Sequence, residues 1–380
     1  MNSLLPADLR TRAVEAEQWA RAAFAGDAHN AGFDGAAWCE LAHSGLFRTA
    51  LPTARGGDGH GAVGITALLE ALGRGGADRG LLMACGAHIF GCEVPVSAYA
   101  SPAQSVQWLP ALASGAIVGA LAVTEPGGGS TFERMTTRAT TTYKGISLNG
   151  RKTLVCNAPV CQLLVVLAQQ FPDRGVLGLT AFLVPRETPG LHVEQVVRTS
   201  GLPGAPLGEV VLDGCILPED AVLGRPGAGL RVFMTAMKWE RCGLLAGFLG
   251  AAEHDLLACA ETLAGRGGNL LKHQAVAHKL ALIKVRLATA RAMLRQAAVS
   301  IDAGNDDHAL SAMAKLVISE ALVDCAQDTA RLLAGAGWAG KPFDAGAALA
   351  DTLGGLFASG TSEILLDLIA RSVMAGALAP

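Results

Sequence analysis

The sequence predicts a three-part, mainly helical protein with a β unit at its centre. Residues 3–115 combine helical periodicity with glycine-rich breaks, whereas short apolar or alternating runs of strand length begin at about residue 117. Helical periodicity returns near residue 226. The chain has 380 residues, more than a single core usually organises, and we divide it into domains at 1–116, 117–225 and 226–380.

The composition is that of a globular protein that associates with itself. Hydrophobic residues make up 51% of the chain, charged residues 17%, and the mean hydropathy is +0.37, which indicates more apolar surface than one chain buries alone. The net charge of −3 and the lack of a basic tract argue against nucleic acid and anionic membranes as partners. Residues 94–124 carry no charge, but prolines interrupt them, so we do not expect a membrane span there.

Nine cysteines are scattered through the chain, with no C-x-x-C pair and no histidine cluster beside them. This pattern is typical of reduced thiols and argues against a structural metal site. The first residues, MNSLLPADLRTR, lack the charged and apolar regions of a signal peptide. Both observations lead us to expect a cytoplasmic protein.

The N-terminal domain should contain helices connected by turn-rich loops. The segment PTARGGDGHG at 52–61 predicts one such loop. His88 is a lone histidine in an apolar stretch, for which a buried structural role is favoured over a catalytic one. The helices are expected at 8–25, 34–45, 63–74, 79–99 and 103–113.

The middle domain should be a compact all-β unit, because its apolar runs are short and are separated by Gly, Pro and Asn turns. Asn149-Gly150 can take the positive φ angles of a type I′ turn, which predicts a hairpin at that point. The strands are expected at 117–124, 141–156, 161–170, 178–186, 191–197 and 208–218.

The C-terminal domain should be built from long helices. One continuous helix is expected over 230–258, and a second over 273–301 has apolar residues in alternating steps of four and three, as in a helical bundle. A third covers about 308–333, and a fourth begins at Thr361-Ser362, where hydroxyls can cap the first amides.

The helix predicted over 230–258 carries a carboxylate in an apolar surface. A carboxylate beside a groove of small residues would be partly desolvated, which raises its pKa as a general base requires. From this stretch alone, a structural ion pair with a basic residue elsewhere is the favoured alternative. The residues at helical spacing around Glu240 do not pair with its charge, and they are Ala236, Met237, Gly243, Leu244 and Gly247.

Three glycine-rich loops could hold a cofactor. In TEPGGGST (124–131), uncovered backbone amides and flanking hydroxyls could receive a heteroaromatic ring or a phosphate. This loop lacks the G-x-G-x-x-G spacing of a dinucleotide site. AGAGWAGK (334–341) and ASGTSE (358–363) have the same character, and each loop by itself is more often a turn than a site.

Together and in this order, the segments resemble the acyl-CoA dehydrogenase superfamily of flavoproteins over essentially the whole chain. The resemblance implies FAD as cofactor, a β-barrel middle domain between a helical N-terminal domain and a C-terminal four-helix bundle, and a homotetramer or homodimer. The matching motifs are VTEPGGGS (123–130), NGRK (149–152), EVVLDGCILPEDAVLG (209–224), LLKHQAV (270–276), GAG (335–337) and GTSEI (360–364).

By that resemblance, the first glycine-rich loop would bind the flavin ring, with Thr124 and Ser130 bonding the isoalloxazine. Leu154 and Cys156 stand where the family has a tryptophan and a threonine that pack on the flavin. Thr131 stands where the family has an aspartate.

The resemblance also assigns residues to the rest of FAD. Thr361 and Glu363 would contact its adenosine half, and Arg266 is what remains of an R-x-F-G motif for the pyrophosphate. The ADP site contributed by a neighbouring subunit would be lined by Gln274, Gly335 and Gly337.

Most members of the family carry the catalytic base in an E-G-T segment, where this chain has Ser359-Gly360-Thr361. A minority carry the base on the first long helix after the β domain, immediately before an arginine, and Glu240-Arg241 stands there. The resemblance therefore implies Glu240 as base, with the backbone N–H of Ser359 in the oxyanion site. Arg241 would be structural or would contact the phosphopantetheine arm or the carrier surface, and with Gly243 it is assigned to the substrate site.

The implied reaction is α,β-dehydrogenation of an acyl or aminoacyl thioester, in which Glu240 removes the α proton while the β hydrogen leaves as hydride to flavin N5. Segments 237–250, 156–160 and 358–362 further resemble the branch that acts on groups tethered to carrier proteins, so the thioester would be carried by a carrier protein or by CoA. The electron acceptor would be an electron-transfer flavoprotein or O2. Two alternatives stay open: a flavin oxidase or monooxygenase of the same fold, and a degenerate, non-catalytic binder of carrier proteins.

Overall fold

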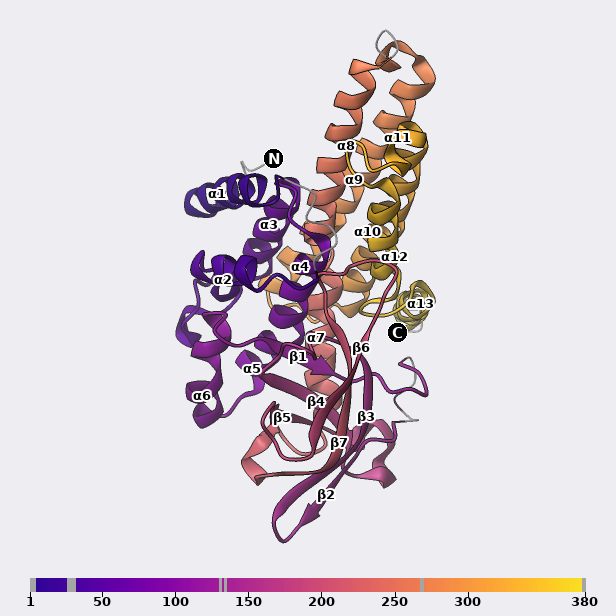
Figure 1. The fold of residues 1–380 in the computed structure, drawn as a ribbon. Helices are drawn as coiled ribbons and strands as arrows, with labels where there is room; N and C mark the ends of the chain where they lie inside the picture. The colour runs from indigo at the N-terminus through magenta and orange to yellow at the C-terminus, as the bar shows by residue number, and fades with distance from the viewer. Residues whose placement is uncertain (1–4, 26–31, 130–131, 133–134, 267–269, 378–380) are drawn as a thin grey trace.

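The computed structural model describes residues 5–25, 32–129, 132, 135–266 and 270–377. Figure 1 shows N-terminal helices packed beside the lower part of a long helical bundle, with a sheet domain below both. Helix α7 leads from the sheet domain up into the bundle. The predicted order of a helical, a β and a helical part is therefore confirmed.

All five helical segments predicted for the N-terminal part are present. The segment expected over 79–99 is one continuous helical run, but its centre is a π-helix, Ala87–Glu93. A π-turn within an α-helix often lies at a functional site. The helices are α1 (Ala7–Ala23), α2 (Gly35–His43), α3 (Gly61–Arg74), α4 (Arg79–Gly86), α5 (Val94–Tyr99) and α6 (Pro102–Ala113).

His88 lies inside this π-helix and is fully buried. Its Nδ1 accepts the backbone N–H of Gly119 at 2.9 Å, and its Nε2 lies 3.2 Å from the carbonyl oxygen of Leu112. Burial lowers the pKa of His88 to about 4, so the ring is neutral at physiological pH. These contacts agree with the predicted structural role of His88.

The middle part is one mixed sheet, and the closed barrel that we expected is not found. Its strand order is β6-β7-β3-β2-β4-β5-β8, and β1 adds in parallel to β4. Among the described strands, β6 and β8 pair on one side only, and β2 joins β4 through a single residue pair, so the sheet stays open. The strands are β1 (Gly119–Ala122), β2 (Arg138–Thr142), β3 (Gly145–Cys156), β4 (Leu163–Gln169), β5 (Leu179–Pro185), β6 (Leu191–Val197), β7 (Leu207–Leu217) and β8 (Val222–Leu223).

The hairpin predicted at Asn149-Gly150 is wrong. Strand β3 continues through both residues, and the chain reverses earlier, between Thr142 and Gly145. Gly150 instead lies at a register shift between β3 and β7, where a Cβ would overlap Thr137 on the neighbouring segment. The glycine therefore serves a close backbone approach within a strand rather than a turn.

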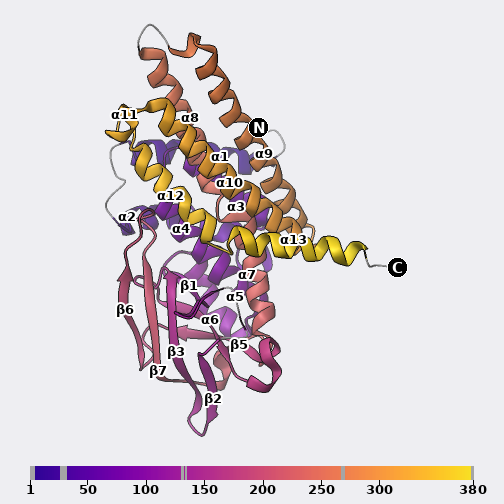
Figure 2. The ribbon, with the colours of Figure 1, turned by 90° about the vertical axis from the view of Figure 1, so that its right-hand side faces the viewer.

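The C-terminal part contains the predicted long helices, but the single helix expected over 230–258 is interrupted. The α-helical conformation is interrupted at Leu244-Leu245, between α7 and α8. The sequence-based prediction also missed α12. Figure 2 shows α13 leaving the bundle and extending away from the body. The helices are α7 (Gly229–Gly243), α8 (Ala246–Gly265), α9 (Gln274–Asp302), α10 (His308–Leu333), α11 (Gly335–Trp338), α12 (Ala345–Phe357) and α13 (Ser362–Ala377).

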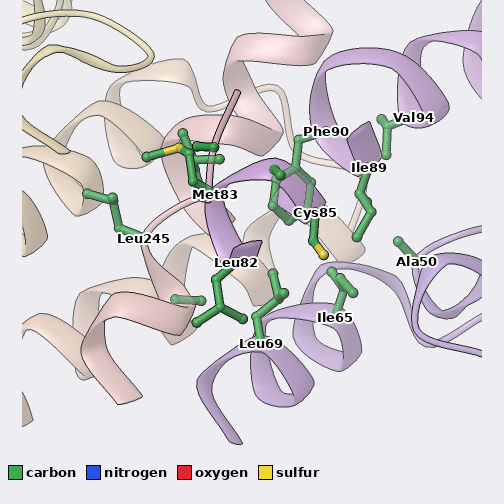
Figure 3. Packing of buried hydrophobic residues seen from close by; sticks show 14 of the residues in the cluster. Ala50, Ile65, Leu69, Leu82, Met83, Cys85, Ile89, Phe90, Val94 and Leu245 are labelled. Atoms are coloured by element: carbon green, nitrogen blue, oxygen red, sulfur yellow. The ribbon is translucent and has the colours of Figure 1, made fainter. Parts of the chain in front are cut away.

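Small residues bring α8 and α3 into close contact next to the π-helix. A Cβ at Gly250 would overlap the carbonyl oxygen of Glu70, and one at Gly73 would overlap that of Gly247. Figure 3 shows the adjoining apolar core, with Phe90, Cys85 and Leu82 among its labelled residues. The small residues around Glu240 noted in the sequence thus let the helices pack closely, and this packing supports the site.

Candidate active site

Glu240, on α7, lies where three parts of the chain meet. Its Oε2 accepts the hydroxyl hydrogen of Ser359 at 2.8 Å, from the turn between α12 and α13. Its Oε1 faces the π-helix, where a Cβ placed on Gly91 would lie 3.0 Å away and 3.1 Å from the Cβ of Leu121 on β1. The absence of a side chain at Gly91 therefore makes the space that the carboxylate occupies.

The surroundings of Glu240 raise its pKa to about 7. Burial is the main cause, and the Ser359 hydrogen bond and the charge of Arg241 oppose it. A carboxyl group with a pKa near neutrality is suited to general-base catalysis at physiological pH. The alternative of a side-chain ion pair does not hold within the described residues, because no salt bridge to Glu240 is formed there.

The turn that carries Ser359 is held by two buried cations. Ser359 has a φ of +58°, an uncommon conformation for a residue other than glycine. Arg241 Nε donates to the Ser359 carbonyl at 3.1 Å, and Lys315 Nζ donates to the carbonyls of Leu356 at 3.0 Å and Gly360 at 2.8 Å. In the part of the chain that the structure describes, neither the amide of Ser359 nor Arg241 Nη1 has a hydrogen-bond partner.

Lys315 was missed by the sequence reasoning. It is only 2% exposed and lies on α10 among small and apolar residues, and burial lowers its pKa to about 8. A lysine on the apolar side of a predicted bundle helix was the available signal, but its partners are main-chain carbonyls far along the sequence, which no local pattern indicates.

The glycine-rich loop is anchored at its first turn by Glu125. This buried carboxylate accepts hydrogen bonds from the backbone N–H and the hydroxyl of both Thr136 and Thr137, at 2.5–2.9 Å. It also accepts the ammonium of Lys152 at 3.0 Å. These donors outweigh burial and hold the pKa of Glu125 at about 2, so it is ionised and serves the loop as a structural group.

Beyond this anchor the loop is open. A Cβ at Gly127 or Gly128 would meet no atom within 4 Å. The Thr124 carbonyl accepts the N–H of Thr153 at 2.8 Å, which places the loop beside the end of β3. Ser130 and Thr131 lie outside the described residues, so the structure does not place the predicted Ser130 contact.

Leu154 and Cys156, which the resemblance places on the flavin, lie at the end of β3. Leu154 has a φ of +53° and is 55% exposed, so a large apolar side chain faces solvent there. Cys156 lies close enough to Glu240 for the two to interact electrostatically, and burial raises the pKa of its thiol to about 12. Asn157, also missed by the sequence reasoning, is buried and donates to the carbonyls of Ala84 and Gly119.

The other predicted site residues divide between two places. Thr361 and Glu363 lie at the start of α13, beside the Ser359 turn, and interact with each other. Gly243 lies one turn from Glu240, but the ring of Phe90 fills the space in front of it, so it contacts a core side chain rather than an open pocket.

The remaining group lies at the far end of the bundle. Arg266 Nη1 donates to the carbonyl of Leu333 at 3.2 Å, next to the exposed Gly335 and the buried Gly337, and Gln274 begins α9. Leu333 lies about 27 Å from Lys315 along α10, at 1.5 Å per residue. One chain therefore does not bring Gly335 and Gly337 to Glu240, and their assignment with Gln274 to an ADP site shared with a neighbouring subunit stays a prediction.

The arrangement near Glu240 fits a flat ring carrying hydrogen-bond acceptors. The glycine-rich loop offers an open backbone face, and the predicted cofactor segments also supply the hydroxyls of Thr124 and Thr361 and the amide of Ser359, which has no partner among the described residues. Groups of this kind suit a flavin, because its ring is planar and has heteroatoms along its edge.

Comparison with known protein families matches nearly the whole chain. The acyl-CoA dehydrogenase N-terminal domain matches residues 9–116, the middle domain matches 120–215, and the C-terminal domain matches 227–374.

Individual relatives are similar over nearly their full length. The L-prolyl-[peptidyl-carrier protein] dehydrogenase of Pseudomonas fluorescens is 35% identical, with 92% of each chain covered. A solved structure of an FAD-dependent dehydrogenase has a TM-score of 0.91 at 34% identity, covering 98% of this chain and 99% of the other. The prolyl acyl carrier protein oxidase AnaB has a TM-score of 0.92 at 29% identity, covering 97% and 99%.

Proposed function

Because the chain belongs to the acyl-CoA dehydrogenase family, we propose that it catalyses FAD-dependent α,β-dehydrogenation of an acyl or aminoacyl thioester, with Glu240 as the base. The observation that carries this proposal is the carboxylate of Glu240, which lies at the junction of α7, the π-helix and the Ser359 turn with a pKa of about 7. The turn itself carries no other carboxylate until Glu363, which is exposed.

The residues divide the work as follows. Glu240 takes the proton from the carbon α to the thioester carbonyl, and the electron pair of that C–H bond forms the new double bond. The free N–H of Ser359 donates to the carbonyl oxygen, on which negative charge develops. Arg241 and Lys315 hold the turn, so that amide and carboxylate keep a fixed spacing. FAD, when bound, supplies the acceptor for the hydrogen that leaves the β carbon with its electron pair.

We propose a carrier-protein thioester as the substrate, because two of the relatives named above are a prolyl-carrier-protein dehydrogenase and a prolyl acyl carrier protein oxidase. The test is anaerobic incubation of the purified protein with prolyl-carrier thioester, other aminoacyl-carrier thioesters and a series of acyl-CoA thioesters, while bleaching of the flavin absorbance is followed. Bleaching by a carrier thioester but not by the matching CoA thioester supports the proposal. Bleaching by acyl-CoA alone would assign the protein to CoA substrates.

A second candidate is an oxidase that returns the electrons to O2, and the name of AnaB as an oxidase favours it. The reduced protein is mixed with oxygenated buffer, and the return of flavin absorbance is timed. Reoxidation as fast as turnover identifies an oxidase. Slow reoxidation that electron-transfer flavoprotein accelerates identifies a dehydrogenase.

We also propose that the active protein is a homodimer or homotetramer. The stretch Ala345–Ala375 is long and apolar enough to cross a membrane by length and composition, yet only 11% of its apolar 18-residue segment is buried within one chain. Exposed Leu366, Val373 and Met374 lie on α13, which extends from the body (Figure 2). A second copy would cover this surface and bring its own bundle end, with Gln274 and Gly335, to the FAD site. Light scattering of the FAD-loaded protein tests this, and a monomer that retains FAD would contradict it.

A further inference from the structure

We propose that Ser359 is a positioning residue for Glu240, and that Lys315 is a second positioning residue that fixes the turn on which Ser359 sits. Ser359 enters the proposed mechanism only through its backbone amide, whereas this inference concerns its hydroxyl. It rests on the proposed role of Glu240 as base.

The hydroxyl of Ser359 makes the two oxygens of Glu240 unequal. Oε2 accepts the hydroxyl hydrogen at 2.8 Å, whereas Oε1 is turned toward Gly91 and Leu121 and has no hydrogen-bond donor among the described residues. A donated hydrogen bond favours the ionised carboxylate. It also restricts the side chain to one orientation, which leaves Oε1 as the oxygen that receives the α proton.

The Ser359 hydroxyl reaches Glu240 because the turn is held in a left-handed conformation. Ser359 has a φ of +58°, and Gly360 follows with a φ of +109°. Such a turn persists when its surroundings fix it. Lys315 does this by donating to the carbonyls before and after Ser359, those of Leu356 and Gly360, while Arg241 binds the carbonyl of Ser359 itself.

Lys315 has no salt bridge within the described residues, so these carbonyls are its only hydrogen-bond partners there. A buried ammonium on α10 is costly unless its hydrogens are used. Its position thus indicates that fixing the turn is its function.

The charged and titratable groups near Glu240 come from several elements. Arg241 on α7 and Cys156 at the end of β3 interact with it electrostatically, and the Ser359 hydroxyl comes from the α12–α13 turn. Lys315 and His308, both on α10, interact with Arg241 rather than with Glu240. Removing Lys315 should therefore affect Glu240 through the turn and not by direct charge.

The experiment uses the FAD-loaded protein and two readouts. The first is the rate of flavin reduction by prolyl-carrier thioester, or by whichever thioester bleaches the wild type, measured from pH 5 to pH 9. The second is the infrared band of the protonated Glu240 carboxyl followed over the same range, which does not depend on turnover. Glu240→Gln identifies that band, because the variant lacks it.

Ser359→Gly keeps the left-handed conformation and removes the hydroxyl. We expect the acid limb of the rate profile and the infrared titration to move upward together by about one pH unit, since a hydrogen bond to a charged group is lost. Ser114→Ala, which removes an exposed hydroxyl at the end of α6, is the control and should leave both unchanged. An unshifted infrared titration in Ser359→Gly would overturn the inference, whatever the rate.

Lys315→Met should shift both readouts in the same direction, and the double variant with Ser359→Gly should shift them no further than Ser359→Gly alone. Additive shifts would show that Lys315 acts independently of the hydroxyl and would remove it from the proposal. Where Lys315→Met lowers the yield of folded protein, Lys315→Arg retains a cation and should give a smaller shift. Normal flavin reduction in Glu240→Gln would instead refute the proposed base, while the infrared comparison still tests Ser359.

Discussion

Two carboxylates near the candidate site show how differently one chain can treat the same chemical group. Glu125 receives donors from Thr136, Thr137 and Lys152, and its pKa falls to about 2. Glu240 receives one hydroxyl, and its pKa rises to about 7. Burial raises the pKa of both groups, but at Glu125 the charge of Lys152 and the threonine donors outweigh it, whereas at Glu240 burial prevails. The carboxylate left with few donors is the one that can exchange a proton near neutral pH.

A third carboxylate extends the series. Glu93, at the end of the π-helix, is fully buried, and neither of its oxygens has a hydrogen-bond partner in the described chain. Its pKa lies well above the ordinary range because burial disfavours the charged form. Glu125, with several donors, is thus an anion. Glu240, with one donor, titrates near neutral pH, and Glu93, with none, is a neutral acid.

The largest effect is expected at Glu240, the carboxylate whose pKa lies near neutrality. Glu240→Gln should keep FAD bound but slow flavin reduction by about 100- to 10,000-fold, because the base is lost while the shape of the side chain is kept. Anaerobic stopped-flow absorbance measures this, and the retained flavin spectrum shows that the fold is intact. Rapid reduction in the variant would assign the proton to another group.

The next largest effect is expected at Glu125, the carboxylate with the most hydrogen-bond donors. Glu125→Gln leaves the ammonium of Lys152 buried without its anion, and we expect a loss of about 3–5 kcal/mol in the free energy of unfolding. The double variant Glu125→Gln/Lys152→Met should be more stable than the single one, because no buried charge remains. Urea denaturation measures both, and equal stability of the two variants would contradict the ion-pair account.

The same pair predicts a dependence on pH. The folded-state pKa of Glu125 is depressed below its unfolded value, so its contribution to stability is present above pH 4.5 and is lost as pH falls toward 2. The midpoint of thermal unfolding of the wild type should fall over this range. Glu125→Gln should show a shallower decline.

A moderate effect is expected from the space beside Glu240. In Gly91→Ala the new methyl group would lie 3.0 Å from Oε1, so the carboxylate must move by a few tenths of an ångström. We expect flavin reduction to slow by about tenfold, since misplacement of a base by a fraction of an ångström already costs rate. Gly35→Ala, at the exposed start of α2, adds a methyl group that meets no atom within 4 Å; it is the control and should leave the rate unchanged.

The smallest effect is expected at Glu93, the carboxyl group without a hydrogen-bond donor among the described residues. The folded-state pKa of Glu93 is raised, so its stabilising contribution is complete below pH 4.5 and declines as pH rises above that value. Glu93→Gln carries no titrating proton, so its stability relative to the wild type should increase as pH rises from 5 to 8. Thermal unfolding at several pH values measures the difference. A gain that does not change with pH would show that Glu93 is not protonated.

Local patterns in the sequence determined most of the fold. Apolar periodicity placed the N-terminal helices and the helix α10, and alternation placed β6, because these features depend on neighbours along the chain. The same reasoning erred where tertiary contacts decide. Gly150 looked like a turn residue but serves an approach to Thr137, and the break at Leu244-Leu245 has no glycine or proline at the break itself.

The site divides in the same way. The sequence by itself identified Glu240 as a carboxylate in an apolar face, and its resemblance to a family supplied the reason to regard it as the base. Only the tertiary structure decided what touches that carboxylate, because Ser359 and Gly91 are distant in sequence and meet it through the packing of α7, the π-helix and the α12–α13 turn. The pKa of Glu240 follows from those contacts, and so does its chemistry.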